Sequence, residues 1–151
     1  MSLEPVQIER QGIAGDPTAE HIFQSLKLVA HRGAIHRCKA SLTVDGEHKG
    51  YFVWKTTARG GSMTERDLVA GERARLPVWN AYKTGGKEYL YLNVDDPVRN
   101  DLSGPSSGLL NLEITFLSEE WSGKRKPEKF RLHLGPWPTG TELSSLGMEK
   151  A

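Results

Sequence analysis

Cysteine is nearly absent from the chain, since Cys38 is the only one among 151 residues. A single thiol excludes an intramolecular disulfide, and it also excludes a zinc site built from several cysteines. An excess of one charge is missing as well, because 20 Lys and Arg residues nearly balance 19 Asp and Glu residues. The resulting net charge of +1 does not create the positive field typical of nucleic-acid-binding domains. We therefore expect a hydrophobic core to stabilise the fold, and we do not expect nucleic acid as a partner.

Long apolar segments are also missing. No stretch approaches the roughly 20 apolar residues that a membrane-spanning helix needs. The first twelve residues include Glu4, Glu9 and Arg10 and contain no apolar run, so they do not resemble a signal peptide. These features predict a soluble, cytoplasmic protein that does not insert into a membrane and carries no cofactor. A domain cut from a larger protein would show the same features.

Alternation of apolar and polar residues is the strongest pattern that is present. In residues 67–79 (DLVAGERARLPVW), Ala74, Leu76 and Val78 share one parity, which is typical of a half-buried antiparallel strand. Pro77 cannot donate a hydrogen bond to a neighbouring strand, so it predicts that this strand lies at a sheet edge or carries a bulge. Further segments have the alternation or the composition of strands, namely 6–10, 21–31, 38–44, 51–55, 89–94, 110–116 and 130–134.

Together these segments predict an all-β fold, an antiparallel β-sandwich of roughly seven or eight strands. We expect residues 1–20 to form a strand and a turn-rich lead-in. Residues 21–135 are expected to form the sandwich, and residues 136–151 a flexible C-terminal tail. Asp45-Gly46 and the segment 83–87 (KTGGK) predict hairpin turns between neighbouring strands.

A short motif precedes the alternating strand. It has the form Leu-x-x-Gly-Glu followed by apolar strand positions, and its residues are Leu68, Gly71, Glu72, Leu76 and Val78. With the earlier strand CKASLTV, residues 20 to 135 resemble immunoglobulin-like bacterial modules of the fibronectin III or cell-adhesion-related type. Cys38 and Trp54 are similar to the Cys and Trp of antibody-type domains, although the second Cys of their inter-sheet disulfide is missing. The resemblance implies a fold and no function.

The Trp and Tyr residues near the alternating strand suggest a binding surface. Trp79 has the parity of Arg73 and Arg75, which predicts that its ring is exposed on one face of the sheet. Exposed Trp and Tyr side chains can stack on sugars or anchor a protein partner. Arg75, Trp79 and Tyr82 therefore form the candidate partner-binding patch, and the same strand at a sheet edge could support self-association. Ordinary packing of Trp79 over the sandwich edge is the alternative.

Acidic residues gather around the loop that follows residue 94. Calcium takes six to eight oxygen ligands, and C2-type sandwiches gather them from Asp-rich loops at one end. Asp67, Asp95, Asp96 and Asp101 could form such a site if their loops converge. Asp is also a common turn residue, so the pattern does not favour a metal site over turns.

No combination of residues predicts catalysis. His36 and Cys38 are two apart on a predicted strand and would share a face, which could pair a thiol with a base. The parity of Cys38 matches that of Leu42, however, and predicts that the thiol lies in the core as a small apolar group. An enzyme would need a deep cleft with a perturbed base, for which His36 and His133 are the candidates.

A basic run beside an aromatic residue offers elements of single-strand nucleic-acid binding. It consists of Trp121, Lys124, Arg125, Lys126, Lys129 and Arg131. Pro127 and Glu128 interrupt the run and Glu119-Glu120 precedes it, which favours a solvated connection.

We therefore expect a non-catalytic β-sandwich interaction module, with a protein-binding or structural role in a larger assembly. The alternatives are a carbohydrate-binding module, which needs a planar row of exposed aromatic residues, and a calcium-dependent C2-like module.

Overall fold

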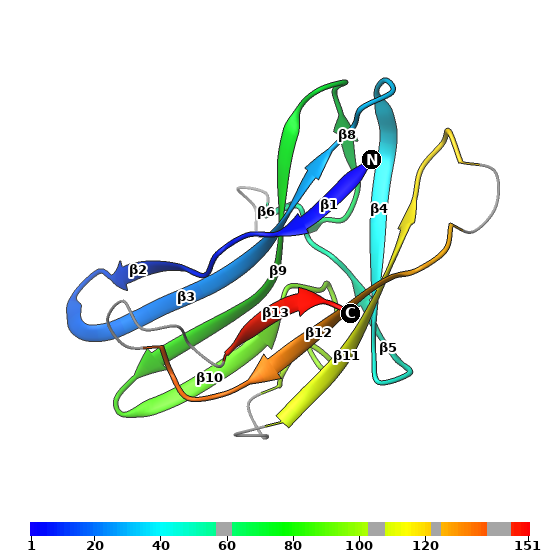
Figure 1. Ribbon diagram of the computed structural model, residues 1–151. Helices are drawn as coiled ribbons and strands as arrows, with labels where there is room; N and C mark the ends of the chain where they lie inside the picture. The colour runs from blue at the N-terminus through cyan, green and yellow to red at the C-terminus, as the bar shows by residue number, and fades with distance from the viewer. Residues whose placement is uncertain (57–61, 103–107, 122–124, 139–145) are drawn as a thin grey trace.

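The computed structural model describes residues 1–56, 62–102, 108–121, 125–138 and 146–151 (Figure 1). The regular structure of these residues consists of thirteen β-strands, and their pairings are antiparallel. Eleven of the strands form two sheets, which confirms the predicted all-β fold, an antiparallel β-sandwich. Within the same residues, no helix is long and apolar enough to cross a membrane.

The first sheet, called sheet I below, has the order β1-β3-β9-β10, with β2 also paired to β3. Its strands are β1 (Ser2–Pro5), β2 (Glu9–Ile13), β3 (Asp16–Val29), β9 (Arg73–Thr84) and β10 (Lys87–Leu92). Sheet II has the order β13-β12-β11-β4-β5, with β8 also paired to β4. Its strands are β4 (Ile35–Val44), β5 (Glu47–Tyr51), β8 (Arg66–Leu68), β11 (Gly108–Leu117), β12 (Glu128–Leu134) and β13 (Gly147–Lys150). A separate hairpin joins β6 (Lys55–Thr56) to β7 (Ser62–Met63).

One hydrophobic core joins the two sheets. Leu26 and Leu28 of β3 and Ile114 of β11 are each 0% exposed, and burying a side chain of this size contributes roughly 1.5–3 kcal/mol. Cys38 and Leu42 of β4 lie in the same core, as their parity predicts. Alternation therefore identified the inward faces of these strands.

Both ends of the chain belong to the sandwich, which corrects the predicted limits of 21–135. Strands β1 and β2 pair with β3, and β13 pairs with β12. Leu3 and Met148 are each 6% exposed, so the terminal strands also contribute to the core. These short strands explain why the strand number exceeds seven or eight. Residues 139–145 of the predicted tail lie outside the described residues.

Two hairpin turns lie at the glycines where the sequence predicts them. Asp45 and Gly46 connect β4 to β5 with φ angles of 48° and 84°, and Gly85 and Gly86 connect β9 to β10 with 58° and 73°. Positive φ at both central residues is the signature of a type I′ turn, whose twist suits antiparallel strands. The predicted turns are thus confirmed.

A β-bulge in β9 changes the direction of its side chains. Ser25 faces Pro77 and Gln24 faces Trp79, so Val78 is an extra residue on β9. Val78 and Trp79 are consequently both turned inward and are 0% exposed. The bulge confirms the expectation from Pro77. Strand β10 pairs with β9 only from Trp79 onward. Among the described strands, residues 73–77 of β9 therefore pair with β3 alone and form an edge of the sheet.

Candidate functional site

Five aromatic residues lie on the outer side of sheet I, on strands β3, β9 and β10. These strands and β2 run together at one end of the sheet (Figure 1). We call this surface the aromatic face, and its rings belong to His21, Phe23, Tyr82, Tyr89 and Tyr91. Their sequence neighbours Ile22, Ala81 and Leu92 are buried, with exposures of 0%, 3% and 2%. Because successive side chains of a strand point to opposite sides, the rings point away from the core. All five are half-buried.

Strand register places these rings in adjacent rows. His21 of β3 faces Tyr82 of β9, and Tyr82 faces Tyr89 of β10. In the next row Phe23 and Tyr91 flank Asn80. Directly opposed residues on one face lie close enough for their side chains to pack, so the register creates a continuous surface across three strands.

Ring geometry makes the centre of the aromatic face compact. The rings of His21 and Tyr82 are stacked, with centroids 4.5 Å apart and planes inclined by 6°. Tyr82 meets Tyr91 edge-on at 6.2 Å, and His21 meets Phe23 in a tilted arrangement at 5.2 Å. Such pairs add about 0.5–1.5 kcal/mol beyond the area they bury. Stacking also covers one face of the His21 ring and one face of the Tyr82 ring.

Two polar contacts hold the His21 imidazole in place. The His21 Nδ1 atom lies 2.7 Å from Nε2 of Gln11, and its Nε2 atom lies 3.0 Å from Oδ1 of Asn80. These distances fit a neutral imidazole that accepts a hydrogen bond from the Gln11 amide and donates one to Asn80. The ring is therefore fixed from strands β2 and β9 at once.

The predicted patch of Arg75, Trp79 and Tyr82 is only partly at the surface. Tyr82 belongs to the aromatic face, and exposed Arg75 forms an ion pair with Glu9 at 3.0 Å. Trp79 is buried, and its Nε1–H donates to Oε1 of Gln24 at 3.0 Å, so it does not contribute to a surface. The prediction for Trp79 was wrong because the bulge at Val78 reverses the inward parity from Trp79 onward. His21, Phe23, Tyr89 and Tyr91 were missed, although their alternation within each strand was visible in the sequence.

A second bulge, in β4, exposes the pair His36 and Arg37. These two residues lie between the pairs Ile35–Leu68 and Cys38–Arg66, opposite the single residue Asp67 of β8. Arg37 has a φ of 52°, in the left-handed region. Both side chains consequently point outward while Cys38 is 0% exposed, so His36 and Cys38 do not share a face.

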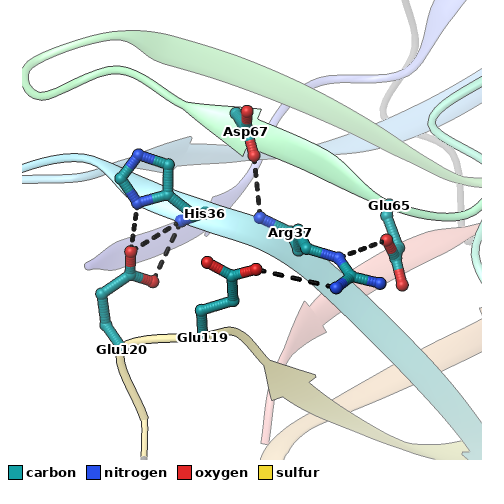
Figure 2. A network of polar contacts seen from close by, with 6 residues as sticks. All are labelled: His36, Arg37, Glu65, Asp67, Glu119 and Glu120. Carbon is teal, nitrogen blue, oxygen red and sulfur yellow. Dashed lines mark hydrogen bonds and ion pairs between the residues drawn. The ribbon is translucent and has the colours of Figure 1, made fainter.

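A polar network surrounds this bulge (Figure 2). The backbone N–H of His36 donates to both carboxylate oxygens of Glu120 at 3.0 Å, and the His36 imidazole also contacts that carboxylate. Arg37 donates its backbone N–H to Asp67 at 2.8 Å and its Nε–H to Glu65 at 3.1 Å, and it lies 3.7 Å from Glu119. The network therefore connects β4 to β8, to the segment before β8 and to the connection after β11.

The contact between His36 and Glu120 shifts the pKa values of both groups. The Glu120 carboxylate raises the pKa of the His36 imidazole, chiefly through their hydrogen bond. The backbone N–H of His36, followed by its imidazole, lowers the pKa of Glu120 to about 2. Hydrogen bonds to a charged form favour that form, so the pair is ionised at mildly acidic pH.

Cys38 does not combine with this network. Burial raises the pKa of its thiol to about 12, which keeps the thiol protonated at neutral pH. An unionised buried thiol is a poor nucleophile. Cys38 thus serves the core as a small apolar side chain.

The four aspartates of the calcium hypothesis have different surroundings. Asp67 accepts from Arg37, Asp95 accepts the backbone N–H of Tyr51 at 2.9 Å, and Asp101 forms an isolated strand bridge with Tyr91. Asp96 caps the following turn by accepting backbone N–H groups from residues 98 and 99. Across the described ranges, no cluster of three or more His, Cys, Asp or Glu residues is arranged to hold a metal ion. These contacts give the aspartates the roles of turn and strand residues.

The basic run beside Trp121 has internal contacts. The Arg125 guanidinium lies over the Trp121 ring, 4.3 Å from its centroid, and Arg131 lies 3.5 Å from Glu149. Lys124 lies outside the described residues. Cation–π and ion-pair contacts of this kind are common at protein surfaces.

Comparisons with protein-family models, curated proteins and solved structures find no match to this chain.

Proposed function

We propose that the protein is a non-catalytic interaction module that binds another protein through the aromatic face. One observation carries this proposal: strand register places His21, Tyr82 and Tyr89 in one row and Phe23 and Tyr91 in the next. Tyr side chains are enriched at protein interfaces because they combine large apolar area with a polar tip. Half-buried rings in rows on a β-sheet can anchor a partner without the entropy cost of ordering a loop.

Ring orientation favours a protein over a carbohydrate. A sugar stacks on the open face of an aromatic ring, and a binding platform therefore needs rings that lie flat. His21 and Tyr82 instead stack on each other, and Tyr82 meets Tyr91 edge-on. These contacts leave fewer open ring faces for a sugar, whereas Tyr side chains can still pack against apolar groups and form hydrogen bonds with a protein partner.

The environments of the candidate bases support a non-catalytic role. His36 pairs with Glu120 on an exposed surface, and His133 contacts Glu149 at 2.9 Å. Cys38 is buried. Each candidate imidazole is thus paired with a carboxylate at the protein surface, which supports a non-catalytic role.

The immunoglobulin-like affiliation also remains a proposal. Strands β3, β4, β11 and β12 occupy two facing sheets in an arrangement that fits strands B, C, F and G of such domains. In sheet I, however, the outer strand β10 follows the inner strand β9 along the chain. The immunoglobulin constant-type order ABED has the outer strand first, so this half of the sandwich departs from that order.

Quantitative pull-down with three forms of the full chain tests the function. The forms are the wild type, the double variant Tyr82→Ala with Tyr91→Ala, and the control Tyr51→Ala, which removes a half-buried Tyr from sheet II. We expect a protein that the wild type and the control retain and that the double variant loses. Titration of that purified protein is then expected to show at least about tenfold weaker binding to the double variant, since each lost anchor costs more than about 1 kcal/mol.

A glycan array probed with the same three forms tests the alternative. Suppose that the wild type binds an oligosaccharide, that the double variant does not, and that the pull-down retains no protein. That result would favour a carbohydrate-binding function over the proposed one. Equal protein retention by all three forms would show that the aromatic face is not the interface. Chemical denaturation of each form confirms that the losses do not come from unfolding.

A further inference from the structure

A cavity of about 210 Å³ opens between the two sheets near the start of β10. Its apolar wall comes from both sheets and from the loops beside them, and the residues of this wall are Ala81, Leu90, Leu102, Leu134, Leu146 and Trp137. Glu88 and Tyr89 supply polar atoms, and neither residue is buried. The cavity shares Tyr89 with the aromatic face, but Ala81 and Leu90 belong to the inward side of sheet I, so most of its wall lies behind that face.

Hydrogen bonds hold the Trp137 wall in place. The Trp137 Nε1–H donates to Oε1 of Glu20 at 2.8 Å, and Glu20 lies 3.5 Å from Nη1 of Arg10. Arg10 also donates to the backbone carbonyl of Pro138. These hydrogen bonds and the ion pair connect the residues after β12 to β2 and β3 of the other sheet. A wall fixed in this way reduces the entropy that a ligand must overcome on binding.

Size and chemistry together define the ligand. Leucine-lined cavities of about 150 Å³ stay free of water and accept benzene. Leu102, Leu134 and Leu146 are 8%, 7% and 7% exposed, so these three side chains are largely shielded from water. We propose that this cavity binds a small neutral apolar molecule, with the bulk of one aromatic ring or a branched hydrocarbon of similar size.

Titration of the full chain with toluene, followed by NMR of ¹³C-labelled leucine methyl groups, tests the proposal. We expect saturable shifts at Leu90, Leu102, Leu134 and Leu146, and constant positions at Leu28 and Leu68. A dissociation constant of about 1 mM or below is consistent with seven non-hydrogen atoms. Leu102→Phe fills the cavity and is expected to weaken toluene binding at least tenfold. Leu109→Phe makes the same change at a residue that is 46% exposed and outside the cavity, and is expected to leave binding unchanged.

Three outcomes with toluene would overturn the inference. They are constant leucine signals up to the solubility limit of toluene, shifts spread over the whole core, and equal affinity in the two Phe variants. N-acetylphenylalanine amide serves as a second probe. If only this amide moves the four methyl signals, the cavity takes a partner's side chain instead of a free molecule, and the proposal fails. Should Leu102→Phe not fold, Ala81→Leu fills the same space from β9.

Discussion

The indole of Trp79 donates a hydrogen bond to the buried side-chain oxygen of Gln24, 3.0 Å away. The same oxygen accepts the backbone N–H of Met148 at 2.7 Å, and the Gln24 amide donates to the carbonyl of Val6 at 2.9 Å. One polar side chain, 5% exposed, therefore links the core of β9 to segments near both ends of the chain. Its hydrogen-bonding capacity is well used, which explains how an amide is tolerated in this core.

Gln24→Leu is expected to destabilise the protein strongly. The substitution leaves the Trp79 and Met148 donors without their acceptor, and each buried unsatisfied group costs about 1–3 kcal/mol. Urea unfolding should therefore show a loss of roughly 2–5 kcal/mol. Gln7→Leu, the same change at an exposed position, is expected to stay within about 0.5 kcal/mol of the wild type. Equal losses in the two variants would contradict the role assigned to Gln24.

The stacked pair His21 and Tyr82 is expected to be energetically coupled. In a double-mutant cycle with His21→Ala and Tyr82→Ala, we expect a coupling of about 0.5–1.5 kcal/mol in the free energy of unfolding. The control cycle combines His21→Ala with Tyr51→Ala of sheet II and should be additive within about 0.5 kcal/mol. Additivity in the first cycle would show that the rings are neighbours without a stabilising contact.

Stability is expected to depend on pH through His36 and Glu120. The raised pKa of His36 means that its contribution is complete below its ordinary pKa of 6.5 and is lost as pH rises through the folded-state value. The lowered pKa of Glu120 means that its contribution is present above 4.5 and is lost as pH falls toward about 2. The pair therefore stabilises the protein most between pH 4.5 and 6.5.

His36→Gln tests this pH dependence. Urea unfolding from pH 5 to pH 8 is expected to show that the difference between wild type and variant shrinks as pH rises. His31→Gln is the control, because the His31 imidazole lies 2.9 Å from the hydroxyl of Ser2. An NMR titration should place the pKa of His36 above 6.5. A difference that does not change with pH would show that the ion pair of His36 and Glu120 does not cause the pH dependence of stability.

The inward faces could be predicted wherever a strand is regular. Cys38, Leu42, Leu112 and Phe130 are buried as their parity requires, because side chains alternate between the two faces of a strand. The hairpin at Gly85-Gly86 could be predicted for a local reason as well, since glycine adopts positive φ without steric cost. Both properties depend on residues that are close together in the sequence.

Bulges and pairings between distant strands could not be predicted in the same way. Pro77 indicated an edge or a bulge, yet only the pairing with Ser25 and Gln24 decides that Val78 is the extra residue. That choice buries Trp79 and places Tyr82 on the outer face. The row of His21, Tyr82 and Tyr89 likewise needs β3, β9 and β10 to pair in one register.

The sequence by itself determined the β-sandwich and most of its core, because alternation and turn residues act over a few positions. The tertiary structure alone decided which aromatic residues meet, where β13 docks, and how Gln24 satisfies Trp79. These features depend on contacts between distant segments, such as the 124 residues that separate Gln24 from Met148. Contacts at such separation depend on how the sheets pack, and local side-chain preferences do not encode that packing.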